Sequence, residues 1–167
     1  LPDSGGIARY LGVLAKDLGD SCISVRTKTW RIWPHWVPAI WQVISRRSLF
    51  DVLLVSHILP YGWVAWSSSW MTHKPFILIL HSMDYALSRQ RAWKRWSARF
   101  LLRRASCVVT NSRWLAEEIK NEVKGIEPVV CYPPLDPRHE TILPSSPKVS
   151  DRLGLLTVAR LVPRKGH

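Results

Sequence analysis

The feature that most constrains the fold is a set of short apolar runs that end in polar residues. Residues 51–57 (DVLLVSH), 75–82 (PFILILHS) and 106–112 (SCVVTNS) share this design, and residues 128–132 (PVVCY) add a fourth run. Uninterrupted apolar runs of this length are typical of strands that are buried on both faces, as in parallel sheets. No run approaches the ~18 apolar residues of a transmembrane helix.

Segments with helical spacing separate these runs. In residues 7–18, apolar side chains recur at 7, 10, 11, 14 and 18, with Gly5-Gly6 before the segment and Gly19 after it, which predicts a helix with a glycine C-cap. Strands that alternate with helices predict an α/β fold with a doubly wound parallel sheet. The other expected helices cover residues 39–48, 62–72, 88–104 and 113–124.

Polar residues follow the expected strands directly. His57, His81, Asn111 and Ser112 occupy these positions. In doubly wound sheets the ligand crevice lies at the carboxyl ends of the strands, so these residues are candidates for a binding site. The two histidines and Ser112 also have a structural alternative. A histidine can simply cap a strand, and Ser112 is well placed as the N-cap of the next helix, which is the role we expect for it.

The C-terminal part of the sequence changes character. Residues 133–152 are rich in proline and serine and predict an interdomain linker. Residues 153–159 then begin a new apolar strand, which is followed by Arg160-Leu161-Val162-Pro163-Arg164-Lys165-Gly166. We expect both ends of the chain to be cuts in a longer protein.

The segment from Ala159 to Gly166 resembles the opening of the donor-binding domain in family 4 glycosyltransferases. The resemblance implies that Arg160 and Lys165 hold the diphosphate of a nucleotide sugar. Two fixed cations would stabilise the negative charge that grows on this leaving group. The hinge at residues 132–136 departs from the family pattern, because Pro134-Leu135 replaces the usual Gly-Val.

Two further motifs resemble the same family in the expected order. Ser4-Gly5-Gly6-Ile7-Ala8-Arg9 resembles its N-terminal glycine loop, where backbone N–H groups at a helix start can approach an anion. Residues 79–84 (ILHSMD) resemble its strand-end histidine motif. The resemblance implies that Gly5 and Gly6 shape the phosphate loop, that His81 positions the donor sugar or the acceptor, and that the acceptor cleft includes His57, Ser82, Asn111 and Ser112.

The resemblance implies a GT-B fold and a defined domain organisation. Residues 1–132 would be a Rossmann-like acceptor-side domain without its first strand, residues 133–152 the linker, and residues 153–167 the start of the nucleotide-sugar-binding domain. The implied reaction is retaining transfer of a sugar from a nucleoside-diphosphate sugar to a hydroxyl of a polysaccharide, lipid carrier or small molecule. No cofactor or metal is implied, no Asp-x-Asp motif occurs, and we expect this chain alone to be inactive.

The net charge of +12 and ten tryptophans indicate an anionic partner. Residues 89–104 carry seven basic residues and no acid. One face can be cationic and another aromatic, which suits an anionic membrane surface, although the aromatic residues can instead pack on the sheet. We expect a cytoplasmic protein, with possible peripheral contact at the inner face of the membrane. The candidate membrane residues are Arg91, Trp93, Lys94, Arg95, Trp96 and Arg99.

Two alternatives to a sugar transferase stay open at this point. A non-catalytic, basic Rossmann-like module that binds an anionic membrane or nucleic acid would explain the charge but not the Arg-x4-Lys-Gly ending. Nucleic acid is the weaker partner, because no recognition motif is evident. A GT-B relative that uses a non-sugar phosphate substrate is the second alternative.

Overall fold

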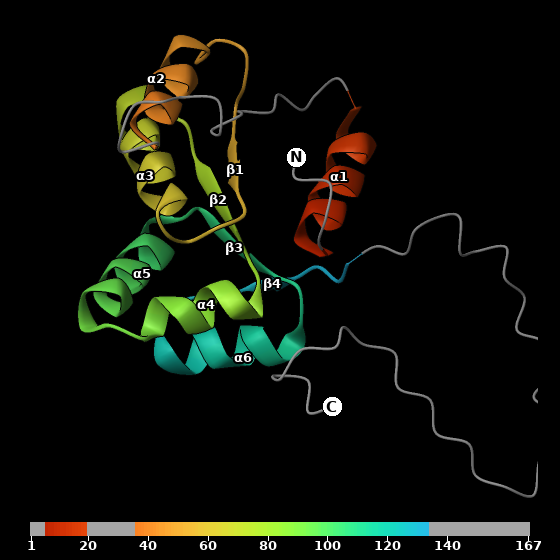
Figure 1. Cartoon of the computed structure of the whole chain (residues 1–167), viewed down its shortest axis with the longest axis vertical. Coiled ribbons are helices and arrows are strands. Elements are labelled where there is room, and N and C mark those ends of the chain that lie inside the picture. The colour runs from red at the N-terminus through yellow and green to blue at the C-terminus, as the bar shows by residue number, and fades with distance from the viewer. Residues whose placement is uncertain (1–5, 20–35, 134–167) are drawn as a thin grey trace, which may run out of the picture. The chain divides into compact units, whose positions relative to one another are not determined.

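A computed structural model of the chain describes residues 6–19 and 36–133. In this part of the chain helices and parallel strands alternate (Figure 1). The elements are α1 (Gly6–Leu18), α2 (Val37–Ser45), β1 (Leu53–Val55), α3 (Tyr61–Thr72), β2 (Phe76–Leu80), α4 (Ser82–Arg89), α5 (Ala92–Arg104), β3 (Cys107–Thr110), α6 (Arg113–Glu122) and β4 (Val129–Val130).

The four strands form one sheet in the order β1-β2-β3-β4, and all neighbouring pairs are parallel. Because each connection leads to the next strand in the same direction, right-handed crossovers bring the intervening helices to one face of the sheet. Accordingly, α3 contacts both β1 and β2, and α6 contacts both β3 and β4. The predicted α/β fold with a parallel sheet is confirmed, and it matches a Rossmann-like domain.

The core lies between β2 and the helices of the crossovers. Leu78 and Leu80 of β2 are fully buried, as are Leu101 of α5 and Leu115 and Ile119 of α6. Burying a leucine or isoleucine side chain of this kind stabilises the fold by roughly 1.5–3 kcal/mol. The prediction of a strand buried on both faces is therefore confirmed for residues 76–80.

The same prediction is wrong for the run at residues 51–57. Only Leu53–Val55 form a strand, and the middle residue Leu54 is 43% exposed. Among the described residues β1 pairs with β2 alone, so it is an edge strand whose apolar sequence is not matched by burial. At the other edge, Val129 of β4 is also exposed.

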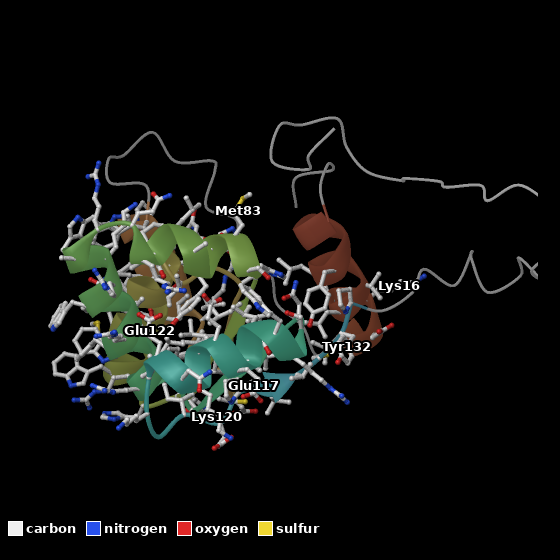
Figure 2. All side chains as sticks on the ribbon, turned by 90° about the horizontal axis from the view of Figure 1, so that it is seen from below. Lys16, Met83, Glu117, Lys120, Glu122 and Tyr132 are labelled. Carbon is white, nitrogen blue, oxygen red and sulfur yellow. The ribbon has the colours of Figure 1, made fainter. Side chains whose placement is uncertain are left out.

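The single basic helix expected over residues 88–104 is two helices. α4 ends at Arg89, Arg91 is extended with φ −127° and ψ 142°, and α5 begins at Ala92. The Ser88 hydroxyl donates to the Tyr85 carbonyl at 2.7 Å, which offers the last turn of α4 an alternative to a continued helix. The break turns the chain, so that α4 lies beside α6 (Figures 1 and 2) while α5 contacts α3 and α4.

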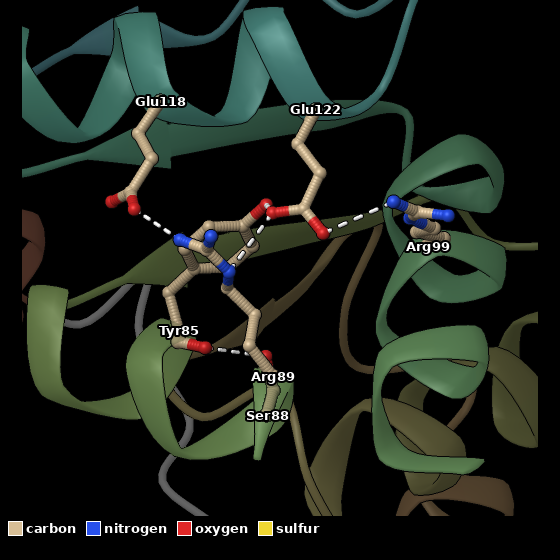
Figure 3. A network of polar contacts seen from close by, with 6 residues as sticks. All are labelled: Tyr85, Ser88, Arg89, Arg99, Glu118 and Glu122. Atoms are coloured by element: carbon tan, nitrogen blue, oxygen red, sulfur yellow. Dashed lines mark hydrogen bonds and ion pairs between the residues drawn. The ribbon is translucent and has the colours of Figure 1, made fainter. Parts of the chain in front are cut away.

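A polar network joins these helices around Glu122 of α6 (Figure 3). The buried Tyr85 hydroxyl donates to Glu122 Oε2 at 2.7 Å, and Arg89 Nε lies 3.1 Å from the same oxygen. Arg99 Nη2 donates to Glu122 Oε1 at 3.2 Å, and Arg89 also pairs with Glu118. Burial and the Glu122 carboxylate raise the pKa of Tyr85 well above its ordinary value. The network ties three helices together through one half-buried carboxylate.

Two predicted helix ends are confirmed. Gly19 follows α1 with φ +53°, a left-handed conformation that glycine adopts without strain. Ser112 is the N-cap of α6, and its hydroxyl accepts from the Leu115 N–H at 3.3 Å. Several predicted features lie outside the described residues. They are Gly5, the predicted linker at 133–152 except for its first residue, and the donor-domain segment with Arg160 and Lys165.

Candidate functional site

The carboxyl edge of the sheet brings the predicted strand-end residues together. Leu80 of β2 pairs with Thr110 of β3, so His81 and Asn111 leave neighbouring strands at the same level. His57 follows β1, the neighbour of β2 on its other side. The expectation that these three residues share one edge of the sheet follows directly from the parallel register.

His81 is the most buried member of this group. It is the N-cap of α4, with φ −116° and ψ 144°, and only 6% of the residue is exposed. Burial lowers the pKa of His81 below its ordinary value, while the nearby Asp84 carboxylate partly opposes the shift. The imidazole is therefore uncharged near neutral pH. Within the described part of the chain its Nε2 atom has no hydrogen-bond partner.

Asp84 is a member of the site that we did not predict as a site residue. It lies in the first turn of α4, where a carboxylate interacts favourably with the helix dipole. Its Oδ1 atom is 3.8 Å from His57 Nε2, and His57 Nδ1 lies 3.1 Å from the Ser56 hydroxyl. The Oδ2 atom is buried and has no partner among the described residues. The signal was present in the sequence, because Asp84 follows the strand-end His81 by less than one helical turn.

The remaining predicted acceptor residues divide into three cases. Asn111 is half-buried, and its Oδ1 atom has no hydrogen-bond partner in the described segments. Ser112 uses its hydroxyl as the α6 cap, so the structure gives it a structural role. Ser82 begins α4 and is exposed.

α1 also contributes to the site. The Tyr10 ring lies edge-on to the His81 ring, with centroids 5.7 Å apart. Burial, together with a hydrogen bond to the Cys131 thiol, raises the pKa of Tyr10 to about 12, so the phenol stays protonated in the neutral range. Gly6, which we expected to precede the helix, is the first residue of α1. The aromatic ring of Tyr10 shields one side of His81 from water and helps to explain its burial.

A second surface of interest lies on α3 and α5. Trp63 and Trp66 of α3 meet Phe100 and Trp96 of α5, with neighbouring ring centroids 5.3–6.5 Å apart. We refer to these four residues as the aromatic cluster. A surface hollow of about 350 Å³ adjoins it, lined by Trp96, Arg99, Phe100, Arg103 and Arg104. We predicted an aromatic face on residues 89–104, but neither its contact with the tryptophans of α3 nor the hollow.

The predicted membrane residues do not form one cationic face and one aromatic face. Arg91 lies before α5 rather than in it, and Arg99 is bound to Glu122. Trp93 is 57% exposed and carries Lys94 Nζ 5.8 Å from its ring centroid, apart from the aromatic cluster. Arg95 is exposed, and Trp96 is 63% exposed although it stacks on Phe100.

No helix in the described segments is long and apolar enough to cross a membrane. No group of three or more His, Cys, Asp or Glu side chains in them is arranged to hold a metal ion.

A comparison with models of protein families finds a match that covers most of the chain. The model of a family described as Glycosyltransferase Family 4 matches residues 17–139, well over half of the chain. A search of curated proteins finds no match to this sequence.

Proposed function

The chain belongs to glycosyltransferase family 4, and from that premise we propose that it forms the acceptor-side domain of a retaining enzyme. The enzyme would move a sugar from a nucleoside diphosphate to an acceptor hydroxyl. Family membership favours this reading over a non-catalytic basic module. In the proposed arrangement residues 133–152 link this domain to a donor-binding domain of GT-B type that begins near residue 153.

The observation that carries the proposal is the polar group at the carboxyl edge of the sheet. His81, Asp84 and Asn111 each have a buried polar atom without a partner in the described residues. Buried polar atoms in folded proteins are nearly always hydrogen-bonded, so such a group at a strand edge is a reason to look for a ligand. A buried, uncharged His81 suits contact with a sugar hydroxyl better than charge neutralisation of a phosphate.

The diphosphate would then depend on other residues. We propose that Arg160 and Lys165, together with the Gly5-Gly6 entry to α1, bind the donor diphosphate. The cationic groups of Arg160 and Lys165 would act most strongly in the transition state, when the bond from the anomeric carbon to the phosphate oxygen breaks and charge moves onto the leaving group. The acceptor oxygen bonds to the same carbon and gives its proton to the departing phosphate oxygen, and in this proposal the sugar is transferred without a metal or cofactor.

A donor screen on the full-length protein tests the reaction. Nucleoside-diphosphate sugars are supplied one at a time with a panel of sugar and lipid acceptors, and release of nucleoside diphosphate is measured. Release with one donor, and a product whose anomeric configuration by NMR equals that of the donor, is the expected result. No release with any donor, or an inverted product, would contradict the proposal.

Two variants assign the roles. Lys165→Ala should reduce turnover strongly and leave the unfolding midpoint unchanged, whereas Lys124→Ala, at an exposed position on the acceptor-side domain, should change neither. His81→Ala should reduce transfer while nucleotide binding stays near that of the parent protein. Equal losses of turnover and stability in Lys165→Ala would count against a role in donor binding.

We also propose that the α3–α5 surface contacts an anionic membrane, such as the cytoplasmic face that many lipid-linked acceptors occupy. The supporting observation is the aromatic cluster beside a hollow with three arginines, of which Arg103 and Arg104 have no carboxylate within 4 Å among the described residues. Tryptophan and arginine together suit the membrane–water interface, where each basic residue contributes on the order of 1 kcal/mol.

Vesicle binding tests this contact. The protein should sediment with vesicles that contain phosphatidylglycerol and not with pure phosphatidylcholine vesicles, and Trp96→Ala should weaken the binding. Trp114→Ala is the matched control, because Trp114 on α6 is 66% exposed and Trp96 is 63% exposed. Equal effects of the two substitutions, or tighter binding to DNA than to anionic vesicles, would refute a membrane contact at this surface.

A further inference from the structure

The unpartnered polar atoms at the carboxyl edge of the sheet are of a particular chemical kind. Asp84 Oδ2 and Asn111 Oδ1 are oxygens that can only accept hydrogen bonds. His81 Nε2 can accept or donate in a neutral imidazole, depending on which nitrogen carries the proton. A molecule that satisfies all three atoms must therefore present hydrogen-bond donors, and more than one of them.

Both the sequence and the sheet register bring these three residues to one edge of the sheet. His81 and Asn111 continue neighbouring strands after the paired Leu80 and Thr110. Asp84 lies in the first turn of the helix that His81 caps, and it reaches His57 on the far side of β2 with Oδ1, which leaves Oδ2 for another partner. His81 is more than nine-tenths buried, so its unpartnered nitrogen is not simply hydrated at the surface.

These hydrogen-bond acceptors argue against a phosphate group, although the strongly basic composition would suggest one. A phosphate group offers only acceptor oxygens at neutral pH and would be repelled by the Asp84 carboxylate. A cationic ligand is disfavoured by the net charge of +12. Neutral hydroxyl groups remain, and several hydroxyls on one ring are the property of a sugar.

We propose that Asp84 and Asn111, with His81, form a binding site for two or more hydroxyl groups of one sugar ring. The proposal deepens the proposed function and rests on it, because it makes Asp84 and Asn111 the residues that recognise one of the two sugars in the reaction. The sugar can belong to the donor or to the acceptor, and the hydroxyl chemistry is the same for both. The diphosphate is bound elsewhere.

The thermal unfolding midpoint of an Asp84→Asn variant distinguishes a binding residue from a structural one. The buried Oδ2 atom without a partner costs stability, whereas the carboxylate charge in the first turn of α4 contributes a little stability through the helix dipole, so Asp84→Asn should change the thermal unfolding midpoint little. If Asp84 served only to hold His57, the same change would lower the midpoint and leave sugar binding intact. Measurement of both properties therefore separates a binding residue from a structural one.

A binding experiment that needs no turnover provides the first test. Saturation-transfer NMR is recorded with the full-length protein and the methyl α-glycosides of glucose, galactose and mannose, one at a time. At least one glycoside should receive saturation from the parent protein, and added inorganic phosphate should not displace it. Asp84→Asn and Asn111→Ala should each reduce the signal about tenfold or more, the effect expected when a hydrogen bond to a buried acceptor is lost.

Asp51→Asn is the control, because Asp51 has an almost fully exposed carboxylate that pairs with Lys74 at 2.9 Å. It should bind the glycosides as the parent protein does. Equal saturation by the parent protein and by Asp84→Asn, or no saturation by either, overturns the inference whatever the donor screen returns. Glycoside binding that is lost in Asp84→Asn, together with a failed donor screen, would instead contradict the proposed reaction and support the sugar site.

Steady-state kinetics of an active protein assigns the sugar to a substrate. Asp84→Asn should raise the KM of only one substrate, by about tenfold, and a deoxy analogue that lacks the bound hydroxyl should remove the difference between the parent protein and the variant. A rise for the donor assigns the site to the transferred sugar, and a rise for the acceptor assigns it to the receiving sugar. Unchanged KM values for both substrates would overturn the inference.

Discussion

Replacement of Glu122 by alanine should lower the free energy of unfolding by more than the loss of an exposed ion pair in the described segments would. The carboxylate of Glu122 is only 14% exposed and accepts from Tyr85 and from two arginines, so one side chain joins α4, α5 and α6 (Figure 3). In Figure 2, Glu122 lies between α4 and α6, whereas Lys120 of the same helix points outward.

The size of the effect can be worked from exposure. The Tyr85 hydroxyl is buried, and a buried donor that loses its acceptor costs roughly 1–3 kcal/mol. Arg89 and Arg99 are 42% and 44% exposed and can be hydrated once the carboxylate is gone, so each lost ion pair counts for no more than about 1 kcal/mol. We therefore expect Glu122→Ala to lower the free energy of unfolding by about 2–4 kcal/mol.

Urea unfolding followed by tryptophan fluorescence measures this, because the chain has ten tryptophans. A double-mutant cycle with Tyr85→Phe isolates the hydroxyl: with the hydroxyl already removed, Glu122→Ala should cost about 1–2 kcal/mol less. Glu127→Ala is the control, since Glu127 is 79% exposed where it pairs with Lys120, and its unfolding midpoint should not move. Additive effects of Tyr85→Phe and Glu122→Ala would refute the reasoning.

Three further expected outcomes concern His81, Gly12 and Gly62. Because burial lowers the pKa of His81, the unfolded chain takes up a proton that the folded chain does not, so the free energy of unfolding should fall as pH drops below the unfolded value of about 6.5. Urea titrations between pH 7 and pH 5 should show this slope, and His81→Gln should reduce it. Gly12→Ala, where an added Cβ meets nothing within 4 Å, should stabilise α1 by about 0.5–1 kcal/mol in thermal unfolding. Gly62→Ala should instead lower the midpoint, because its Cβ would lie 2.8 Å from Leu101 Cδ1 in the packed core.

The parts of the fold that the sequence predicts are those fixed by neighbours along the chain or by burial on both sides. Residues 76–80 are a central strand, and their apolar pattern is matched by burial. The Ser112 cap depends on an N–H three residues away, so a local rule suffices. For Leu54 the prediction of burial from an apolar run fails. The residues of this run do not show whether the strand has a neighbour on both sides or lies at the edge of the sheet.

The break between α4 and α5 depends on partners that are remote in sequence. Residues 88–104 contain neither glycine nor proline, and their arginines and leucines favour a continuous helix. The contact that α4 makes through Tyr85 lies 37 residues away at Glu122. Packing of α4 against α6 therefore outweighs the helical preference of Gln90 and Arg91, and the Ser88 hydroxyl is too weak a local signal to predict the break.

The number of cations free to bind an anionic partner also cannot be predicted from the sequence of residues 89–104 alone. Seven basic residues between 89 and 104 suggest a uniformly cationic face, yet α6 supplies Glu118 and Glu122 to Arg89 and Arg99. The cations available to an anionic partner are therefore fewer than the sequence counts, and Arg103 and Arg104 beside the aromatic cluster are among them. The salt dependence of vesicle binding should accordingly respond to Arg103→Gln and much less to Arg89→Gln, because Arg89 is already neutralised by the protein itself.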